Sequence, residues 1–488
     1  MDEKKLEKIV SWAKRRGFIF PGSEIYGGLG GVYDLGPYGV TLKNNIKKLW
    51  WKTFVEDRDD VVGIESSILM NRQVWQASGH EKNFVDWMVE CQNCHTRIRI
   101  DDLPVESQKK GNEIFWHSKG SVLCTVCGKD IDIKPVASVR QFNTMFKTYI
   151  GATQDEKNMT YLRPETAQGM FTDFKQVMEV SRKKIPFGIA QMGKSFRNEI
   201  MTKDFLFRVR EFEIAEIEYF VKPGTDEKFF DEWLKNWEDF LLSLGLKKEN
   251  LKNYEHPKES LAHYSKRTID IQYNYPFGWK ELTGVANRTD FDLKSHEEAS
   301  GKDMKYFDEE TKEKYWPYVI EPTLGIERLM LAVICDAYEE CPSGRNDSHP
   351  EEQGDEGSPA NAGNIADKLR DSSPAAQNDS IETVLHFNPA LAPVKIAVFP
   401  LSKKINDEAR KVYDDLKTCY GDIEFDESGS IGKRYRRQDE IGTPFCVTFD
   451  FDSIDDKKVT VRDRDTMKQE RILISELKNY LFKKLKIL

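Results

Sequence analysis

The sequence predicts a multidomain protein of mixed α and β structure, with a large N-terminal part that contains antiparallel strands and a small C-terminal α/β domain. The chain has 488 residues, too many for one hydrophobic core, so we expect two to four domains. Within residues 187–220, two β-like runs around a polar loop predict a long antiparallel hairpin. In roughly the last hundred residues, a strand, a helix, a strand pair and a helix follow one another, which indicates a small α/β domain.

A stretch of low complexity divides the chain. Residues 341–380 are rich in Gly, Pro, Ser, Asn, Asp and Glu and almost free of large apolar side chains, so they cannot bury enough surface to offset chain ordering. We interpret residues 341–382 as an acidic linker or insertion. It separates a large domain at residues 1–340 from a small domain at residues 383–488.

Composition and charge exclude some classes of protein. Mean hydropathy is −0.62 and no apolar run approaches the ~18 to 20 residues of a membrane helix, which excludes a membrane-spanning protein. Residues 1–17 carry apolar side chains at helical spacing, which predicts an amphipathic surface helix rather than a signal peptide. We therefore expect the protein to be located in the cytoplasm. The net charge of −9 argues against bulk attraction of nucleic acid, but a basic cluster at residues 433–437 is compatible with a placed contact patch.

Two pairs of cysteines have the spacing of a zinc site. Two residues separate the members of each pair, so their thiolates can converge on one tetrahedral ion, and two pairs complete a four-thiolate shell. Structural disulfides are the alternative, which a chain without an export signal disfavours. A closed shell leaves no open position for catalysis, so we predict a structural zinc. The predicted ligands are Cys91, Cys94, Cys124 and Cys127.

The second strand of the predicted hairpin carries an unusual combination of side chains. Alternation with a period of two places the following residues on one face: Arg208, Arg210, Phe212, Ile214 and Glu216. Cations, an aromatic ring and a carboxylate on one buried face are not a normal core pattern. A solvent-exposed face with salt bridges is the alternative interpretation.

Three other segments place charged residues beside expected strands and helices. Arg163 and Glu165 precede an apparent helix start, and Glu281 lies in an expected strand at residues 279–288. Within residues 319–331 a strand is expected to break at Pro322 and Gly325 and to continue as an apolar helix. Each segment alone is a weak signal.

Taken in this order, the segments resemble the active site of class II aminoacyl-tRNA synthetases, most closely the homodimeric glycyl-tRNA synthetases. The motifs are RPETAQGMF, GKSFRNEI, RVREFEIAEIEYF, ELTGVANRTDFDL and EPTLGIERLML, with IYGGLGGVYDLGPYGVTLKNNIKKLWW and GKRYRRQDEIGTPFCVTFD nearer the ends of the chain. The resemblance implies an α+β catalytic domain on a mixed, mainly antiparallel sheet, the class II synthetase fold. It also implies a zinc-ribbon-like insertion at residues 88–135, a helical insertion at residues 221–265 and a C-terminal α/β anticodon-binding domain.

The activity that the resemblance implies is the joining of glycine to ATP as glycyl-adenylate, followed by transfer of glycine to the 3′ end of tRNA(Gly). Because a carboxylate and a triphosphate repel each other, cations must neutralise the charge that develops on phosphorus. The resemblance assigns ATP binding to Arg197, Glu199, Arg208, Phe212, Glu281, Glu321 and Arg328, with Arg197 and Arg328 as catalytic residues. Mg²⁺ would be held mainly by ATP phosphates, with Glu281 and Glu321 as candidate protein ligands.

Each of these residues has an implied task. Arg197 would bind the α-phosphate and the substrate carboxylate, and Arg328 would reach the terminal phosphates and lie near adenine. Arg208 would assist at the triphosphate. Phe212 would stack on the adenine ring, and Glu199 would accept a hydrogen bond from its amino group.

Glycine offers no side chain to recognise, so recognition must use its ammonium group and the exclusion of any larger substituent. The resemblance implies that Glu165 and Glu216 supply charge-assisted acceptors and that the hydroxyl of Thr323 supplies a third. Steric rejection of alanine would make a separate editing site unnecessary. The family usually has serine where this chain has Thr323, which keeps the hydroxyl and adds a methyl group.

The C-terminal domain resembles the anticodon-binding domain of several class II synthetases, and the implied contacts with tRNA are Arg434, Arg436, Arg437 and Gln438. Residues 39–51 are predicted to continue as a helix, and the resemblance implies that this helix forms part of a homodimer interface. Two alternatives are a synthetase-like paralogue that binds RNA or protein without aminoacylation, and a class II synthetase for another small amino acid. Paralogues of the first kind typically lose the ATP-binding arginines, which this chain retains.

Overall fold

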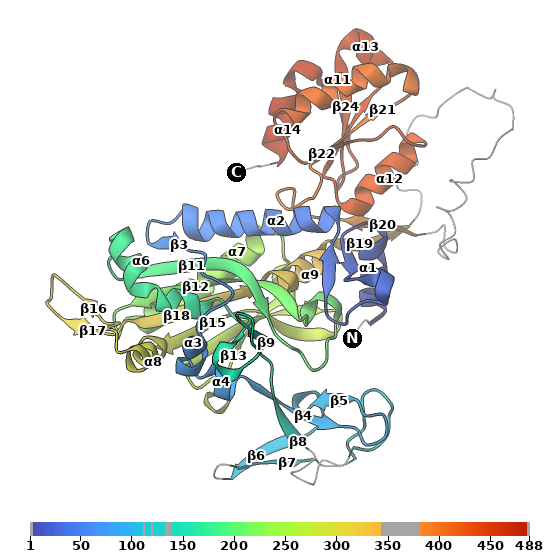
Figure 1. Cartoon of the computed structure of the whole chain (residues 1–488). Helices are drawn as coiled ribbons and strands as arrows, with labels where there is room; N and C mark the ends of the chain where they lie inside the picture. The colour runs from blue at the N-terminus through green and yellow to red at the C-terminus, as the bar shows by residue number, and fades with distance from the viewer. Residues whose placement is uncertain (1–2, 111–112, 119–120, 132–138, 343–380, 486–488) are drawn as a thin grey trace. The chain divides into compact units, whose positions relative to one another are not determined.

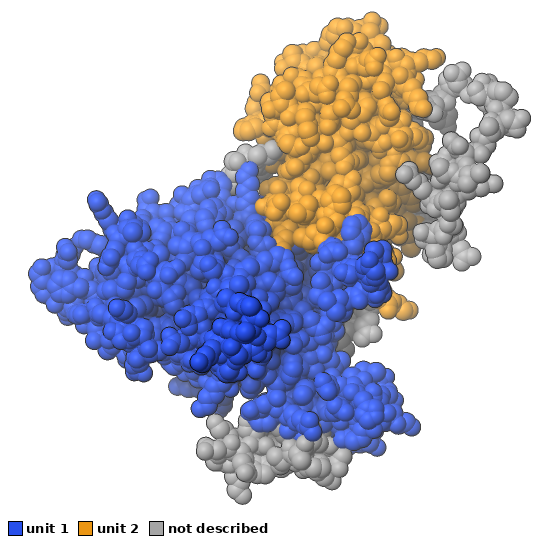
Figure 2. Space-filling view, viewed as in Figure 1, with its two compact units in different colours: residues 1–3, 20–34, 47–332 blue, residues 4–19, 35–46, 333–488 orange. Residues whose placement is uncertain are grey.

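The computed structural model describes residues 3–110, 113–118, 121–131, 139–342 and 381–485 (Figure 1). Most of the predicted linker at 341–382 and parts of the predicted insertion at 88–135 lie outside the described residues. The chain forms two compact units (Figure 2). Unit 1 comprises residues 1–3, 20–34 and 47–332, and unit 2 comprises residues 4–19, 35–46 and 333–488. Unit 2 therefore includes two N-terminal stretches that the predicted boundaries place in the first domain.

Unit 1 is built on a seven-stranded sheet. Its strand order is β13-β14-β15-β18-β12-β11-β3, and every neighbouring pair is antiparallel except β11 and β3. The strands are β3 (Val61–Gly63), β11 (Phe187–Phe196), β12 (Glu211–Val221), β13 (Leu251–Glu255), β14 (Arg267–Tyr275), β15 (Gly278–Thr289) and β18 (Tyr318–Gly325). This confirms the expected mixed, mainly antiparallel sheet.

The predicted hairpin is present, and β11 pairs with β12 from Phe187 opposite Phe220 to Phe196 opposite Glu211. The prediction for β18 was wrong in one respect, because the strand continues through Pro322 to Gly325. The pairing of β18 with β12 is interrupted between Ile320 and Thr323, so Pro322 lies where no ladder bond from its missing N–H is needed. As predicted, a helix, α9 (Ile326–Ala337), then begins.

Helices pack on both faces of this sheet. Phe220 of β12 contacts Phe174 of α6, with ring centroids 4.4 Å apart, whereas its neighbour Tyr219 contacts Trp233 of α7 at 5.2 Å. Because successive strand residues point to opposite faces, α6 and α7 lie on opposite sides. The helices of this unit include α3 (Arg72–Ala77), α4 (His80–Asn83), α5 (Ala167–Thr172), α6 (Phe174–Ser181), α7 (Asp226–Ser243) and α8 (Phe291–Ser300).

The segment predicted as a helical insertion, residues 221–265, is helical only in part. It contains α7, which buries Trp233, Trp237 and Phe240, and then the edge strand β13. Short two-stranded pairs complete unit 1: β9 (Lys147–Tyr149) with β10 (Met159–Tyr161), and β16 (Tyr306–Phe307) with β17 (Lys314–Tyr315).

The cysteine-bearing segment forms small sheets of its own. β4 (Val85–Glu90) lies between β5 (Arg97–Arg99) and β8 (Val139–Asn143), and β6 (Glu106–Lys110) pairs with β7 (Glu113–His117). Its small core includes Val89, Ile98, Ile100 and Val122. The described part of this segment therefore has an apolar centre separate from that of the main sheet.

Unit 2 contains the predicted α/β domain. Its five-stranded sheet has the order β22-β21-β23-β24-β25, in which β21 is parallel to β22 and β23 and the other pairs are antiparallel. The predicted strands and helices appear as β21 (Ile396–Pro400), α11 (Asn406–Lys417), β23 (Phe445–Phe449), β24 (Lys458–Asp463) and α14 (Leu477–Leu485). Four further elements of this domain were not predicted from the sequence: β22 (Ile423–Phe425), α12 (Ile431–Ile441), α13 (Asp452–Asp456) and β25 (Gln469–Leu473).

Two N-terminal helices were predicted correctly. α1 (Glu3–Arg15) is amphipathic and buries Ile9, Trp12 and Ala13, and α2 (Pro37–Trp51) includes the predicted helix at residues 39–51. Outside these helices lie β1 (Ile19–Pro21), β2 (Tyr33–Leu35), and the antiparallel pair β19 (Tyr338–Pro342) and β20 (Ile381–Leu385). Across the described ranges, none of the helices combines the length and apolarity needed to cross a bilayer.

Candidate active site

One cavity of unit 1 lies against β12, β15 and β18, and it gathers every residue that the sequence predicted for ATP and the amino acid. These are Glu165, Arg197, Glu199, Arg208, Phe212, Glu216, Glu281, Glu321, Thr323 and Arg328. The expected common face of β12 is correct for Phe212, Ile214 and Glu216. Arg208 and Arg210 precede the strand, and Arg210 donates to the backbone carbonyl of Glu199 at 3.0 Å instead of lining the cavity.

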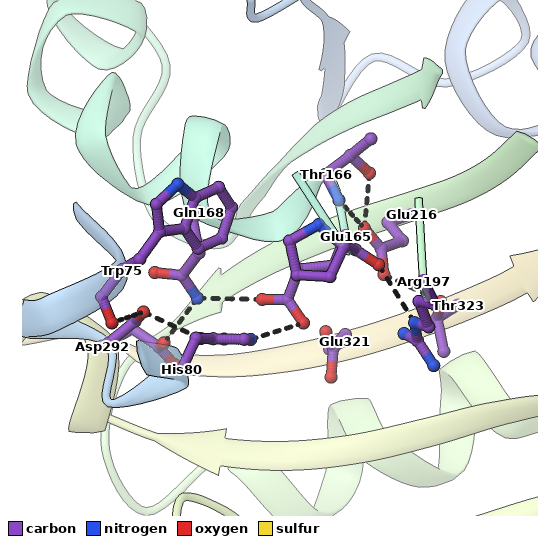
Figure 3. A network of polar contacts seen from close by, with 12 residues as sticks. Trp75, His80, Glu165, Thr166, Gln168, Arg197, Glu216, Asp292, Glu321 and Thr323 are labelled. Carbon is purple, nitrogen blue, oxygen red and sulfur yellow. Dashed lines mark hydrogen bonds and ion pairs between the residues drawn. The ribbon is translucent and has the colours of Figure 1, made fainter. Parts of the chain in front are cut away.

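Glu216 is fixed in the cavity wall by both of its oxygens (Figure 3). Its Oε2 accepts hydrogen bonds from the backbone N–H of Thr166, at 2.7 Å, and from the Thr166 hydroxyl, and its Oε1 accepts from the Thr323 hydroxyl at 3.0 Å. Burial, and then the nearby Glu165 carboxylate, raise the pKa of Glu216. Because Thr323 uses its proton on Glu216, its oxygen lone pairs remain able to accept from a ligand.

Glu165 is the second buried carboxylate of the cavity, and its two oxygens have different donors. Oε1 accepts from Gln168 Nε2 at 3.0 Å, and Oε2 lies 3.1 Å from His80 Nε2 (Figure 3). Burial acts to raise the pKa of Glu165, but His80 and Arg288 outweigh it and hold the pKa below its usual range. His80 was not predicted from the sequence, because it lies outside the recognised motifs.

Arg288 is a buried cation behind these carboxylates. It donates to both oxygens of Asp292, at 2.8 and 2.9 Å, and to Glu321 Oε1 at 2.9 Å. Burial raises the pKa of Glu321 despite this guanidinium. Of the two candidate magnesium ligands, Glu321 is already bound to Arg288, whereas the side chain of Glu281 is 46% exposed.

Arg197 and Arg328 enter the cavity from different elements. The Arg197 guanidinium lies over the rings of Phe84 and Phe212, at 5.2 and 5.4 Å from their centroids, and its Nε donates to a backbone carbonyl. Arg328, in the first turn of α9, lies 4.5 Å from the Phe207 ring centroid and pairs with Glu281 at 3.0 Å. Arg328 lowers the pKa of Glu281, so this carboxylate stays ionised.

Glu199 and Arg208 occupy another part of the wall. Among the residues that the structure describes, Glu199 Oε2 is buried without a hydrogen-bond partner, and burial raises the pKa of this carboxyl group. Arg208 Nη1 lies 3.5 Å from Asp102 Oδ2, and Lys203 pairs with the other oxygen of Asp102 at 2.9 Å. Asp102 belongs to the cysteine-bearing segment, so that segment contacts a cation of the cavity.

The four predicted zinc ligands lie together. The Sγ atoms of Cys91, Cys94, Cys124 and Cys127 are all within 4.8 Å of one another. In both pairs the residue after the second cysteine has a left-handed backbone conformation, with φ of 56° at His95 and 68° at Gly128. Backbone N–H groups also point at sulfur, as at Val126 and Cys124, 3.4 Å apart. Two turns of the same shape thus present four thiols to one point.

The predicted anticodon residues differ from one another in accessibility. Arg434 is 4% exposed and donates to the backbone carbonyls of Glu427 and Gly429, so the structure places it in support of a loop and not on a surface patch. Arg436 and Arg437 have partly exposed side chains, and Arg437 pairs with Asp426 at 2.6 Å.

A second cavity, within unit 2, contains Arg437 and Gln438. Residues from the N-terminal part of the chain also line this cavity, among them Arg15, Arg16 and Tyr38, and they were not predicted from the sequence. The Tyr38 hydroxyl and Gln438 Nε2 donate to the two oxygens of Glu424, at 2.6 and 2.8 Å. Only tertiary structure could reveal this, since the contributing segments are far apart in the sequence.

Comparison with known proteins identifies the family. Residues 146–337 match the model of the tRNA synthetase class II core domain (G, H, P, S and T), and residues 395–484 match the anticodon binding domain. The fold is similar to that of the prolyl-tRNA synthetase from Cryptosporidium parvum complexed with L-proline and AMP, with a TM-score of 0.59 at 13% identity, covering 98% of this chain and 77% of that one. The core and its cavity therefore define a class II aminoacyl-tRNA synthetase.

Relatives of similar length identify the family within the class II synthetases. The chain is 51% identical to the glycine–tRNA ligase of Caldanaerobacter subterraneus subsp. tengcongensis, over 99% of this chain and 98% of the relative. It is 52% identical to that of Acetivibrio thermocellus, over 98% of each. It is 50% identical to that of Geobacillus thermodenitrificans, over 98% and 97%. The chain belongs to the glycine–tRNA ligase family and is an aminoacyl-tRNA ligase.

Proposed function

We propose that the cavity activates glycine with ATP and then transfers it to the 3′ end of tRNA(Gly). The observation that carries this proposal is the joint presence of two buried carboxylates, Glu165 and Glu216, and two arginines, Arg197 and Arg328, at one cavity. The carboxylates suit an ammonium group and the arginines suit a carboxylate and phosphates. Glycine carries an ammonium group and a carboxylate on one α-carbon, and ATP supplies the phosphates.

The glycine end of the cavity is assigned to Glu165, Glu216 and Thr323. Charge-assisted hydrogen bonds to the two carboxylates and a third to the Thr323 oxygen would hold the ammonium group. The fixed donors on Glu165 and Glu216 keep these acceptors in place before the substrate arrives. Any side chain on the substrate would have to find room among these groups, so alanine is rejected by overlap.

The ATP end is assigned to Arg197, Arg208, Arg328, Phe212 and Glu199. Glu199 Oε2, which has no hydrogen-bond partner among the described residues, suits the amino group of adenine, and the face of Phe212 suits its ring. In the first step a glycine carboxylate oxygen attacks the α-phosphorus and pyrophosphate leaves. In the second, a terminal ribose hydroxyl of tRNA attacks the carbonyl carbon and AMP leaves. Positioned cations lower the barrier without a covalent enzyme intermediate.

Magnesium is the metal that ATP would bring. Carboxylate oxygens are suitable ligands, and Glu281, which is ionised and half exposed, is better placed to reach the ion than Glu321, which Arg288 already binds. When bound, Mg²⁺ would neutralise phosphate charge. Arg328 holds Glu281 at the cavity edge by their ion pair.

Zinc fits the cysteine cluster by distance. A tetrahedral ion with Zn–S bonds of ~2.3 Å separates neighbouring sulfurs by about 3.8 Å. Cys94 and Cys124 are 3.6 Å apart at sulfur, and Cys91 and Cys127 are 3.7 Å apart. We therefore assign these four residues to a structural zinc.

We assign anticodon contact to Arg436 and Arg437 of unit 2, whose side chains are partly exposed. Arg434, which is 4% exposed, supports the loop before α12, and Gln438, which is 2% exposed, donates to Glu424. The anticodon-binding domain match and the cavity beside Arg437 support this assignment. We also propose that the protein forms a homodimer through residues 39–51, which sedimentation of the purified protein can test. We further propose that it is located in the cytoplasm.

The test of the proposed function is ATP/pyrophosphate exchange with a panel of amino acids. Glycine should support exchange, and alanine and serine should give little or none. Arg197→Ala should reduce glycine-dependent exchange by about 100-fold or more, the usual effect of removing one preorganised contact with transition-state charge. Comparable exchange with alanine would contradict the assignment, and tRNA binding without any exchange would favour a paralogue that does not charge tRNA.

A further inference from the structure

We propose that His80 is a positioning residue for substrate recognition: its hydrogen bond to Glu165 aims this carboxylate into the cavity, so that the carboxylate accepts the ammonium group of the amino acid. This inference rests on the proposed function, because it needs Glu165 to bind that group. His80 itself does not line the cavity and lies behind Glu165 (Figure 3).

The first support is the contact between the two side chains. His80 Nε2 and Glu165 Oε2 are 3.1 Å apart, and the side chains are only 6% and 9% exposed. On the far side of the ring, Nδ1 lies 2.8 Å from the Ser78 hydroxyl. Whether Ser78 donates to Nδ1 or accepts from it, Nε2 must carry a proton to bond with an ionised carboxylate, so His80 is the donor to Glu165.

The second support is the way the ring is held. Trp75 lies edge-on to it, with centroids 5.6 Å apart, and Phe84 packs at 5.3 Å. Gly79, just before His80, has φ of +80°, a conformation that other residues adopt only with strain. Asn143 donates to the backbone carbonyl of Glu81 at 3.0 Å and secures the following residue. The imidazole therefore has little freedom to follow a carboxylate that moves.

The third support is electrostatic. Glu165 and Glu216 are both buried at one cavity, and two such charges raise each other's pKa. His80 is the largest of the influences that lower the pKa of Glu165, ahead of Arg288 and Gln168. Loss of His80 would remove the largest influence that lowers the pKa of Glu165. The neutral form of Glu165 would become more populated, and a neutral carboxyl group is a poor acceptor for an ammonium ion.

Gln168 provides a second restraint, so the loss should be partial. It donates to Glu165 Oε1 and is itself held by His296 at 2.9 Å and Asp292 at 3.2 Å. Removing His80 should therefore weaken amino-acid binding by about 10- to 100-fold, in line with one hydrogen bond to a charged group.

The experiment compares three substitutions in the full-length protein by exchange kinetics. His80→Leu removes the donor. His80→Gln places an amide nitrogen near the position of Nε2, and His80→Asn places it near that of Nδ1. We expect His80→Leu and His80→Asn to raise KM for glycine about 10- to 100-fold with KM for ATP within about threefold, and His80→Gln to restore most of the wild-type affinity. The polar Gln and Asn variants keep the comparison valid if the Leu variant folds poorly.

His386→Leu is the matched control. His386 also pairs with a carboxylate, Asp465, at 2.6 Å, but in unit 2. It should leave KM for glycine unchanged. An increase of similar size would mean that loss of any histidine–carboxylate pair perturbs the enzyme, which would overturn the specific role of His80.

Glu165→Gln separates failure of this inference from failure of the proposed function. If Glu165→Gln raises KM for glycine and all His80 variants stay within about twofold of wild type, the positioning role is wrong and the function stands. If neither position affects glycine, the assignment of Glu165 is wrong. If wild type shows no glycine-dependent exchange, the proposed function itself fails. In the supporting case, the double variant His80→Leu/Glu165→Gln is no worse than Glu165→Gln alone.

Discussion

At the scale of single residues, Glu218 shows how closely charge is packed behind the cavity. It lies two positions after Glu216 on the same face of β12 and is fully buried. Among the described residues, neither of its carboxyl oxygens has a hydrogen-bond partner. Burial, and then the nearby Glu321, raise the pKa of Glu218 well above its usual range. The raised pKa favours the neutral form of this carboxyl group in the folded protein.

This gives a prediction about stability and pH. In the unfolded chain Glu218 ionises near its ordinary pKa of ~4.3, while in the folded protein its pKa is raised. The folded state therefore loses relative stability as pH rises from about 4 toward the raised pKa. Glu218→Gln removes this titration. Thermal unfolding between pH 5 and pH 8 should show a smaller fall in Tm with pH for the variant than for wild type. Parallel curves would mean that Glu218 is ionised in the folded protein.

Residues inside recognisable motifs could be predicted as site residues from the sequence. The residues that hold them in position could not. Glu216 and Arg328 line the cavity because strand alternation and the first turn of a helix fix where they point, and Arg197 directly follows the end of β11. His80 could not be found in this way, since its partner is 85 positions away in the sequence. Arg434 shows the opposite error: a basic cluster suggests exposure, but only the fold shows which member turns inward.

At the scale of elements, the residue pattern predicted four strands of the main sheet, β11, β12, β15 and β18, but not β3, β13 and β14, and it misplaced a local break. Pro322 was expected to end a strand, but the interrupted pairing between β18 and β12 accommodates it. α12 was missed because its sequence, IGKRYRRQDEI, is so polar that its buried Tyr435 and Ile441 form too weak a pattern. Tertiary packing decided both cases.

The cysteine segment gives a prediction at this scale. Purified protein should contain about one zinc ion per chain, and Cys91→Ser should release it and increase hydrogen exchange in the segment around residues 91–127. Because Asp102 pairs with Arg208, KM for ATP should rise as well. Cys419→Ser, which changes an exposed cysteine of unit 2, is the control and should retain zinc. Metal analysis without zinc, together with four readily titrated thiols, would refute the assignment.

At the scale of the whole molecule, two tasks are assigned to separate units: adenylate formation to unit 1 and anticodon contact to unit 2. Their independence can be measured on one variant, Arg436→Ala/Arg437→Ala, which leaves the buried Arg434 in place. If these arginines contact tRNA as proposed, charging of tRNA should fall about 10-fold or more while glycine-dependent exchange changes little. For each arginine that binds a phosphate, its removal should also reduce the log–log salt dependence of tRNA binding by about 0.7 to 0.9.

The matched control for that variant is Arg410→Ala/Lys411→Ala, which removes two exposed cations from α11 of the same unit. It should leave charging unchanged. If exchange and charging fall together in Arg436→Ala/Arg437→Ala, these arginines support folding or dimerisation instead of contacting tRNA.

The interleaved course of the chain has a consequence for biosynthesis. Unit 2 contains residues 4–19 and 35–46 together with 333–488, so a ribosome makes its first parts long before its last. At about 5 to 20 residues per second, translation of the intervening residues takes roughly 15 to 60 s. During that time Trp12 lacks the backbone carbonyl of Glu440 to which it donates, and Phe18 lacks the ring of Phe387 that it contacts. Nascent chains should therefore expose apolar N-terminal surface to chaperones until synthesis is nearly finished.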